Sequence, residues 1–220
     1  MNILVIADAQ RYEELQEKGL GKNEVQWKTN LEDVLSVKAF DLVIDTLFDD
    51  RLSNAAIYAR NPEVPVLACM AKVSLAETMN HTAFEQGFNI MGCNLLPGFI
   101  TMPVTEVSVL DETQYSTLDN IMYQLGWEYR VVADAVGLVT PRVVCMIINE
   151  AYLTAEEGTA SREDIDISMK LGTNYPFGPF EWCERIGVKN VYEVLKAVQE
   201  SANDGRFEVA ALLETEYEAI

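Results

Sequence analysis

The 220-residue chain is strongly acidic, with 35 acidic residues against 16 basic ones and a formal net charge of −19. No block of clustered Lys and Arg interrupts this excess, which argues against a surface for nucleic acid or for an anionic membrane. The hydrophobic share of 49% and the charged share of 23% are ordinary for a globular protein. No apolar run reaches the length of a membrane span and no signal peptide precedes the first apolar run, so we expect a cytoplasmic protein.

The first half of the chain predicts a domain of mixed α/β structure. Short apolar runs typical of buried strands alternate with stretches of helical character, the pattern of a sheet with crossover helices. A helix over 114–125 is expected to end at Gly126, and a last strand over 128–133 leads to the domain boundary. The other predicted strands lie at 3–7, 25–28, 40–47, 64–71, around Ile90 and at 105–110.

The remainder of the chain predicts an all-α domain. From Pro141 onward, apolar residues recur at the three- and four-residue spacing of amphipathic helices. We therefore divide the chain into an α/β domain of residues 1–134 and a helical domain of residues 135–220.

The cysteines point to neither a disulfide framework nor a metal site. They are widely spaced and form no Cys-x-x-Cys pair, so we expect reduced thiols packed in the interior and no bound metal. The four residues are Cys69, Cys93, Cys145 and Cys183.

The segment 169–182, MKLGTNYPFGPFEW, joins two predicted helices through a tight turn. The hydroxyl of Ser161 is positioned to cap the first helix at the amide of Asp164. Gly172 is expected to end that helix, and Pro179 stands at a natural first position of the next one.

This segment resembles the C-terminal helical domain of the 3-hydroxyacyl-CoA dehydrogenases, in particular the 3-hydroxybutyryl-CoA dehydrogenase branch. In these proteins a helix carrying EDID…MKLG runs into YPMGPFE. The resemblance extends over about residues 30–210 and implies an NAD-binding Rossmann-like domain, a helical domain that forms homodimers, and a cleft for acyl-CoA. Supporting matches are 41–45 with DLVIE, 92–109 with GMHFFNPVPLMKLVEVV, 134–142 with DTPGFIVNR, and 149–158 with NEA…EEG.

The turn after the first strand departs from the family's nucleotide-binding pattern. Dinucleotide sites need glycines there so that the backbone can approach the pyrophosphate. Here Ala7, Ala9 and Tyr12 occupy the three glycine places, and Asp8 adds a negative charge. Asp41 follows Ala7 after only 34 positions, too few for the family's complete adenosine half. We therefore expect a reduced Rossmann-like domain that opposes the binding of NAD, the family's cofactor.

The resemblance also implies where catalytic residues would lie. The family uses a His that takes the substrate's hydroxyl proton, a Glu that orients it, and a Ser and an Asn that hold the substrate oxygen. Asn94 stands in the His place and Glu106 in the Glu place. Val73, next to Ser74, stands in the Ser place, and Pro141 in the Asn place.

Glu106, Ser74 and Asn94 are thus the candidate catalytic residues, although an asparagine cannot accept a proton at neutral pH. The only histidine, His81, lies thirteen positions before Asn94 in a predicted helix, and we expect it on the surface.

Three hypotheses about function follow from these residues. The leading one is a catalytically impaired member of the family that keeps the helical domain and a cleft for an acyl-CoA or a partner protein. The second is an active NAD-dependent 3-hydroxybutyryl-CoA dehydrogenase of fatty-acid metabolism with a rebuilt site, supported by Glu106 and Ser74. The third is a structural or regulatory subunit.

Overall fold

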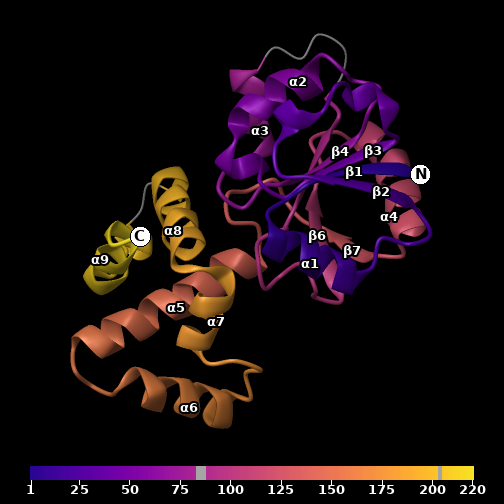
Figure 1. The fold of residues 1–220 in the computed structure, drawn as a ribbon. Coiled ribbons are helices and arrows are strands. Elements are labelled where there is room, and N and C mark those ends of the chain that lie inside the picture. Colours follow the sequence, from indigo (N-terminus) through magenta and orange to yellow (C-terminus); the bar gives the residue numbers. More distant parts are fainter. Residues whose placement is uncertain (83–87, 203–204) are drawn as a thin grey trace. The chain divides into compact units, whose positions relative to one another are not determined.

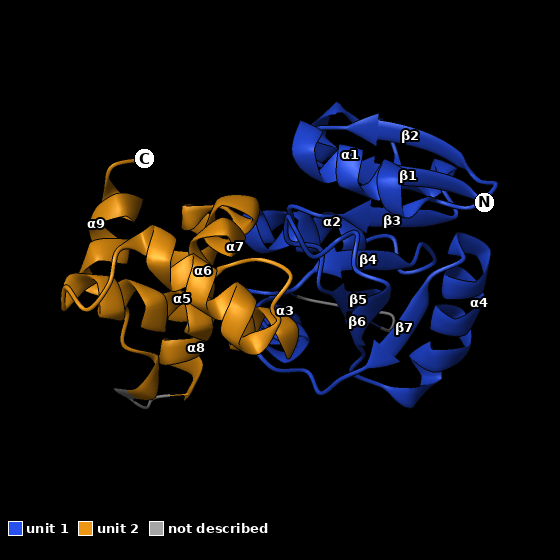
Figure 2. Ribbon diagram, turned by 90° about the horizontal axis from the view of Figure 1, so that it is seen from below, with its two compact units in different colours: residues 1–138 blue, residues 139–220 orange. Residues whose placement is uncertain are grey.

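The computed structural model describes residues 1–82, 88–202 and 205–220 (Figure 1). It divides into two compact units, residues 1–138 and 139–220 (Figure 2). The division after Leu138 lies four residues beyond the boundary expected from the sequence.

Unit 1 is built on a mixed sheet in which the described residues form seven strands, in the order β2-β1-β3-β4-β5-β6-β7. Strands β1 to β5 are parallel, β6 is antiparallel to β5, and β7 is parallel to β6. The α/β prediction is confirmed, and each strand lies within or close to its predicted run. Their bounds are β1 (Asn2–Ile6), β2 (Glu24–Lys28), β3 (Leu42–Asp45), β4 (Val66–Cys69), β5 (Ile90–Cys93), β6 (Val104–Ser108) and β7 (Glu128–Val131).

The central strands are buried because helices and loops cover both faces of the sheet. Every residue of β3, β4 and β5 is buried, as are four of the five residues of β1. Full burial of one such aliphatic side chain contributes about 1.5–3 kcal/mol to folding, so these strands form the stable centre of unit 1.

Four α-helices are described in unit 1, namely α1 (Ala9–Lys18), α2 (Ala55–Ala59), α3 (Leu75–His81) and α4 (Tyr115–Leu125). Helix α4 ends as predicted at Gly126, whose φ of 73° is left-handed. His81 is the last residue of α3 and is exposed, as expected.

The direction in which strands are added to the sheet reverses between β1 and β3. The carboxyl ends of these two strands therefore form a topological switch point. From β1 the chain moves through α1 to β2 on one side and then returns to β3 on the other. Ligands of open α/β sheets bind at such a point. Between β2 and β3 the chain forms only two short 3₁₀ turns, Leu31–Asp33 and Val37–Ala39, which agrees with the expected shortening.

Unit 2 is helical, and its described helices are α5 (Thr140–Glu156), α6 (Arg162–Thr173), α7 (Pro179–Ile186), α8 (Val188–Ala202) and α9 (Ala211–Glu218). The hydroxyl of Ser161 accepts a hydrogen bond from the Asp164 N–H at 3.2 Å, which confirms the predicted cap. Pro179 opens α7, also as predicted.

The predicted end of α6 at Gly172 is wrong. The helix continues to Thr173, and Asn174 takes the left-handed conformation with a φ of 56°. Asparagine is the usual alternative to glycine at this position, so the sequence offered two candidates two residues apart.

All four cysteines are buried free thiols. Within the described part of the chain, no helix combines the length and the apolar composition needed to cross a lipid bilayer.

Candidate functional site

The structure brings Asn94 and Glu106 together. Asn94 directly follows β5, and its backbone N–H donates to the Glu106 carbonyl oxygen in β6 at 3.1 Å. The antiparallel register pairs Cys93 with Val107, so Asn94 stands directly opposite Glu106. Opposed residues of an antiparallel pair present their side chains on the same face of the sheet. The two residues that align with the family's His and Glu are therefore cross-strand neighbours.

The Asn94 side chain lies in the interior, with 7% of its surface exposed. Its Oδ1 atom is buried and has no hydrogen-bond partner among the described residues. A buried carboxamide can accept or donate a hydrogen bond, but it cannot take up a proton at neutral pH. Asn94 can therefore hold a polar group, whereas it cannot serve as a general base.

Ser74 has a structural role at the start of α3. Its Oγ accepts from the Glu77 N–H at 3.2 Å, while the Glu77 carboxylate accepts from the Ser74 N–H at 2.9 Å. This reciprocal arrangement is a capping box, which satisfies amides that the helix leaves unpaired. The carboxylate of Asp134 also accepts from the Leu75 N–H at 2.8 Å. The Ser74 hydroxyl is thus engaged in holding the helix.

Val73 and Pro141 offer no hydroxyl or amide side chain for a substrate oxygen. Val73 is half-buried and packs against the core of unit 1. Pro141 is buried in the first turn of α5 in unit 2. Of the positions identified by resemblance, only those of the His and the Glu carry polar side chains.

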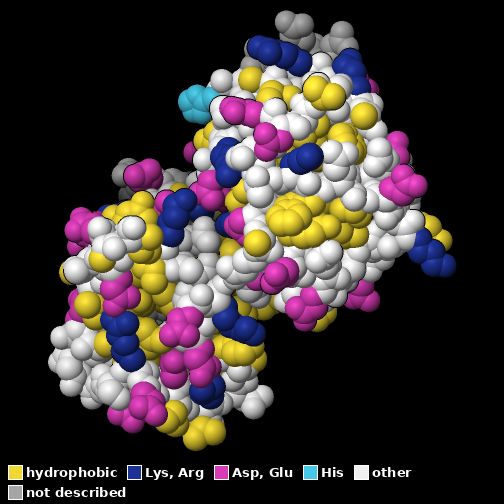
Figure 3. All heavy atoms as spheres, in the orientation of Figure 1, with side chains coloured by type: hydrophobic (Ala, Val, Ile, Leu, Met, Phe, Trp, Pro, Cys, Tyr) yellow, Lys and Arg dark blue, Asp and Glu magenta, His cyan; other side chains and the backbone are white. Residues whose placement is uncertain are grey.

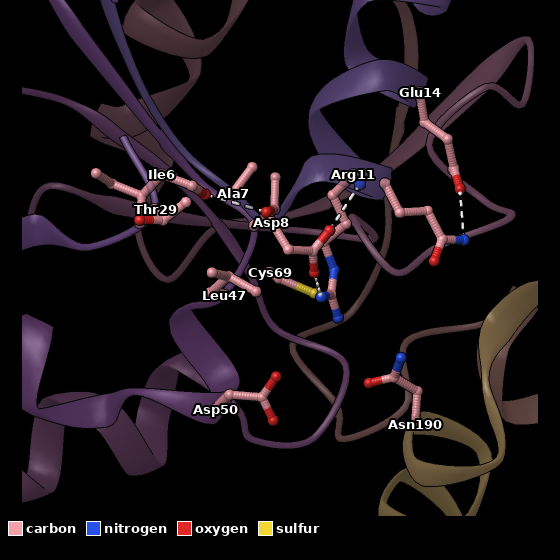
Figure 4. A network of polar contacts seen from close by, with 12 residues as sticks. Ile6, Ala7, Asp8, Arg11, Glu14, Thr29, Leu47, Asp50, Cys69 and Asn190 are labelled. Atoms are coloured by element: carbon pink, nitrogen blue, oxygen red, sulfur yellow. Dashed lines mark hydrogen bonds and ion pairs between the residues drawn. The ribbon is translucent and has the colours of Figure 1, made fainter. Parts of the chain in front are cut away.

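The start of α1 is occupied by a carboxylate of the chain itself. Asp8 is the N-cap of this helix, and its Oδ1 accepts from the Arg11 backbone N–H at 2.8 Å. The same carboxylate forms an ion pair with the Arg11 guanidinium (Figure 4). In dinucleotide sites the amides at this helix end bind the pyrophosphate.

An aromatic pair lies between α1 and β2. The rings of Tyr12 and Trp27 are stacked, with centroids 4.4 Å apart and planes inclined by 7°. The Trp27 indole N–H also donates to the Ala7 carbonyl oxygen at 2.9 Å. A dinucleotide's ribose is held at this side of a Rossmann site, near the end of the second strand. Tyr12, in the third glycine place, thus supplies half of a stack that fills the space beside β2.

A buried carboxylate lies behind Arg11. Asp49 accepts from the Ala71 N–H at 3.2 Å and from the Cys69 thiol at 3.4 Å. Burial raises the pKa of Asp49 to about 6, despite the opposing influence of Lys72. Burial disfavours the charge of Arg11, but Cys69, Asp8 and Asp49 outweigh it, so the pKa of Arg11 is raised.

Sequence reasoning missed the cluster of Arg11, Asp49 and Cys69. The three residues lie on α1, after β3 and at the end of β4, and only the fold brings them together. The sequence signal that could have revealed this cluster was the acidic pair Asp49-Asp50 after a buried strand. The Lys72 ammonium donates to the Asp50 carboxylate at 2.7 Å.

These residues do not fit a dinucleotide. Side chains stand at all three glycine places, Asp8 holds an amide at the helix start, and Asp49 places a second carboxylate nearby. The described residues also contain no group of three or more His, Cys, Asp or Glu arranged to hold a metal ion.

Unit 2 contains an apolar cleft of about 390 Å³ between α5 and α6. Its lining includes Ile147, Ala151, Ile165, Met169 and Pro179. On the face drawn in Figure 3, Lys and Arg side chains are scattered among acidic ones, so this face offers no basic cluster for a polyanion.

Comparison with known proteins identifies the helical unit. Residues 137–219 match the family model of the 3-hydroxyacyl-CoA dehydrogenase C-terminal domain. The 3-hydroxyadipyl-CoA dehydrogenase of Escherichia coli is 37% identical over 92 residues, which are 42% of this chain and 19% of that protein. The 3-hydroxybutyryl-CoA dehydrogenase of Bradyrhizobium diazoefficiens is 25% identical over 179 residues, which are 79% of this chain and 61% of that protein. The chain thus spans less than two thirds of the length of these relatives.

Solved structures share the whole fold. The FadB2 protein of M. tuberculosis superimposes with a TM-score of 0.78 at 17% identity, covering 99% of this chain and 93% of that one. The (S)-3-hydroxybutyryl-CoA dehydrogenase PaaH1 of Ralstonia eutropha gives 0.76 at 19% identity, with the same coverages of 99% and 93%. Residues 137–219 thus match the C-terminal domain of the 3-hydroxyacyl-CoA dehydrogenases, and the chain shares the fold of these solved structures, with a Rossmann-like first unit and a helical second unit.

Proposed function

We propose that this chain is a catalytically impaired member of the 3-hydroxyacyl-CoA dehydrogenase family, retained for its helical domain and for a cleft that binds an acyl-CoA or a partner protein. The observation that carries the proposal is the buried Asn94 opposite Glu106, at the place where the family's proton acceptor stands. Oxidation of an alcohol needs a group that takes up the hydroxyl proton as the carbonyl forms, and a carboxamide does not supply one.

The size of the expected defect follows from the missing group. Removal of a general base typically lowers the rate by about 10²- to 10⁴-fold. The carboxylate at the start of α1 and the Tyr12–Trp27 stack oppose nucleotide binding, which lowers the rate further. Reduction of acetoacetyl-CoA should therefore stay at the level of a blank without protein.

A second candidate function rests on Glu106. A carboxylate beside Asn94 is itself able to accept a proton, so a rebuilt NAD-dependent 3-hydroxybutyryl-CoA dehydrogenase of fatty-acid metabolism is the alternative. The two functions are separated by measuring NADH oxidation at saturating acetoacetyl-CoA. If the parent protein turns over substrate with saturation kinetics and Glu106→Gln abolishes that turnover, the chain is the rebuilt enzyme. The proposal of catalytic impairment would then be wrong.

The variant Asn94→His tests the role of position 94 directly. It restores an imidazole opposite Glu106, yet we expect no turnover because it leaves the start of α1 unchanged. Turnover in Asn94→His but not in the parent protein would show that the nucleotide still binds and that the base alone is missing. Calorimetry with butyryl-CoA then separates an acyl-CoA binder, which gives heat, from a structural or regulatory subunit, which gives none.

We infer that the chain forms a homodimer through its helical unit. We define the α5–α6 surface as the apolar cleft residues Ile147, Ala151 and Met169 together with Ile167 and Leu171, which are exposed on another side of α6. Leu171 is 83% exposed and Ile167 is 44% exposed. Exposed apolar side chains of this kind mark an interaction site, and a second copy of the chain is the occupant we infer. The four buried free thiols suit a reducing compartment, which supports a cytoplasmic location.

A further inference from the structure

The start of α1 has the parts of an oxyanion site. The helix is ten residues long, and its first turn presents backbone amides whose partial positive charge favours an anion. The Arg11 guanidinium points to the same place, since both it and the Arg11 backbone N–H contact the Asp8 carboxylate (Figure 4).

The two members of this ion pair differ in their exposure. The Arg11 side chain is only 5% exposed, whereas that of Asp8 is 44% exposed. Asp8 therefore stands on the solvent side, with the guanidinium buried behind it. The carboxylates of Asp8 and Asp49 both act to raise the pKa of Arg11, so the buried positive charge is balanced by carboxylates of the chain itself.

We propose that Asp8 is a tethered substitute for a phosphate, and that with Arg11 and the Tyr12–Trp27 stack it closes the nucleotide crevice to dinucleotides. The Asp8 carboxylate takes the helix amide and the guanidinium that a pyrophosphate would need. Tyr12 and Trp27 fill the space beside β2. This inference concerns nucleotide binding alone and does not depend on the missing base at Asn94.

The tether explains why a dissolved nucleotide does not displace Asp8. A carboxylate in the same chain is always present at high effective concentration and loses no translational freedom on binding. A displaced Asp8 would also leave its charge beside the incoming phosphates, in a protein that already carries a net charge of −19.

The test removes the tethered anion and supplies a free one. Thermal unfolding is followed for the parent protein and for Asp8→Ala at constant ionic strength, with and without inorganic pyrophosphate. We expect Asp8→Ala to unfold at a lower temperature, and pyrophosphate at about ten times its Kd to raise that temperature by about 3–6 °C. The parent protein should respond to neither pyrophosphate nor NADH.

Three further variants make the result specific. Glu13→Ala removes an exposed carboxylate from the same helix, changes the net charge equally, and should behave like the parent protein. Asp8→Ala combined with Arg11→Ala should lose the response to pyrophosphate. Asp8→Asn keeps a capping side chain, and it replaces Asp8→Ala in the experiment if the alanine variant does not fold.

Two results would overturn the inference. One is a rise in the unfolding temperature of the parent protein with NADH, and the other is an equal response to pyrophosphate in Asp8→Ala, Glu13→Ala and the parent. NADH binding without acetoacetyl-CoA turnover would reject this inference while leaving the proposed loss of catalysis in place. If the protein binds neither NADH nor butyryl-CoA, this inference still holds. Only the proposal that the cleft binds an acyl-CoA would then be wrong.

Discussion

Asp166 lies so close to Gly178 that a Cβ atom on Gly178 would come within 2.3 Å of the Asp166 carboxylate carbon. The Asp166 carboxylate accepts from the N–H of Phe180 at 2.8 Å and from the N–H of Glu181 at 3.3 Å. A residue of α6 thus caps the start of α7, where the helix dipole favours a negative charge. The glycine before Pro179 is required because the carboxylate fills the space that a side chain would need.

We predict that Gly178→Ala destabilises the protein by about 1–3 kcal/mol, because overpacking forces the backbone or Asp166 to move. Asp166→Ala should cost a similar amount, since it leaves two amides of α7 without their acceptor. Gly172→Ala is the matched control, because a Cβ there meets nothing within 4 Å and alanine favours helix interiors. Urea unfolding measures the three variants, and equal stabilities for Gly178→Ala and Gly172→Ala would contradict the assignment.

Asp49 makes stability depend on pH. Burial raises its pKa from 3.8 to about 6, so the folded state holds the proton more tightly than the unfolded state does. The stabilisation from this proton is present at low pH and is lost as the pH rises from about 4 to about 6, to a total of about 3 kcal/mol.

Asp49→Asn cannot titrate, so we predict that the parent protein loses stability relative to this variant across that range of pH. Urea unfolding at pH values between 4 and 7 measures the difference between the two proteins. Asp33→Asn, at an exposed position, is the control for removing one carboxylate. A difference that does not change with pH would show that Asp49 is ionised throughout.

Ser74 should behave as a helix cap. Ser74→Ala removes the acceptor for the Glu77 N–H, and we expect a loss of about 1 kcal/mol. Ser74→Asn can still cap the helix and should recover most of that loss. Unchanged stability in Ser74→Ala would reject the structural role and return the hydroxyl to the list of candidate catalytic groups.

The α5–α6 surface should carry the dimer. Light scattering after size-exclusion chromatography is expected to give twice the chain mass of 24.7 kDa for the parent protein. Leu171→Glu should shift the mass toward the monomer, because it places a charge in an apolar contact. Tyr123→Glu alters an 86% exposed residue of unit 1 and should leave the dimer intact. A parent protein that is monomeric at all concentrations would refute this proposal.

Local patterns were sufficient for much of the fold. The apolar runs predict the strands because both faces of the sheet are covered, and Ser161 and Pro179 mark helix starts through interactions that span only a few residues. The end of α6 was predicted wrongly because Gly172 and Asn174 are both able to end a helix. The neighbouring residues alone do not determine which of the two does so.

The sequence by itself determined the resemblance to the 3-hydroxyacyl-CoA dehydrogenases, the order of strands and helices, and the absence of glycines from the turn after β1. It also predicted the spacing that sets Asn94 against Glu106. Only the tertiary structure decided that Asp8 is held by Arg11, that Tyr12 stacks on Trp27, and that Asp134 caps α3 from a distance of 59 positions along the chain. The physical reason is that propensities and caps act within a few residues, whereas such partners are chosen by sheet order and packing across the whole unit.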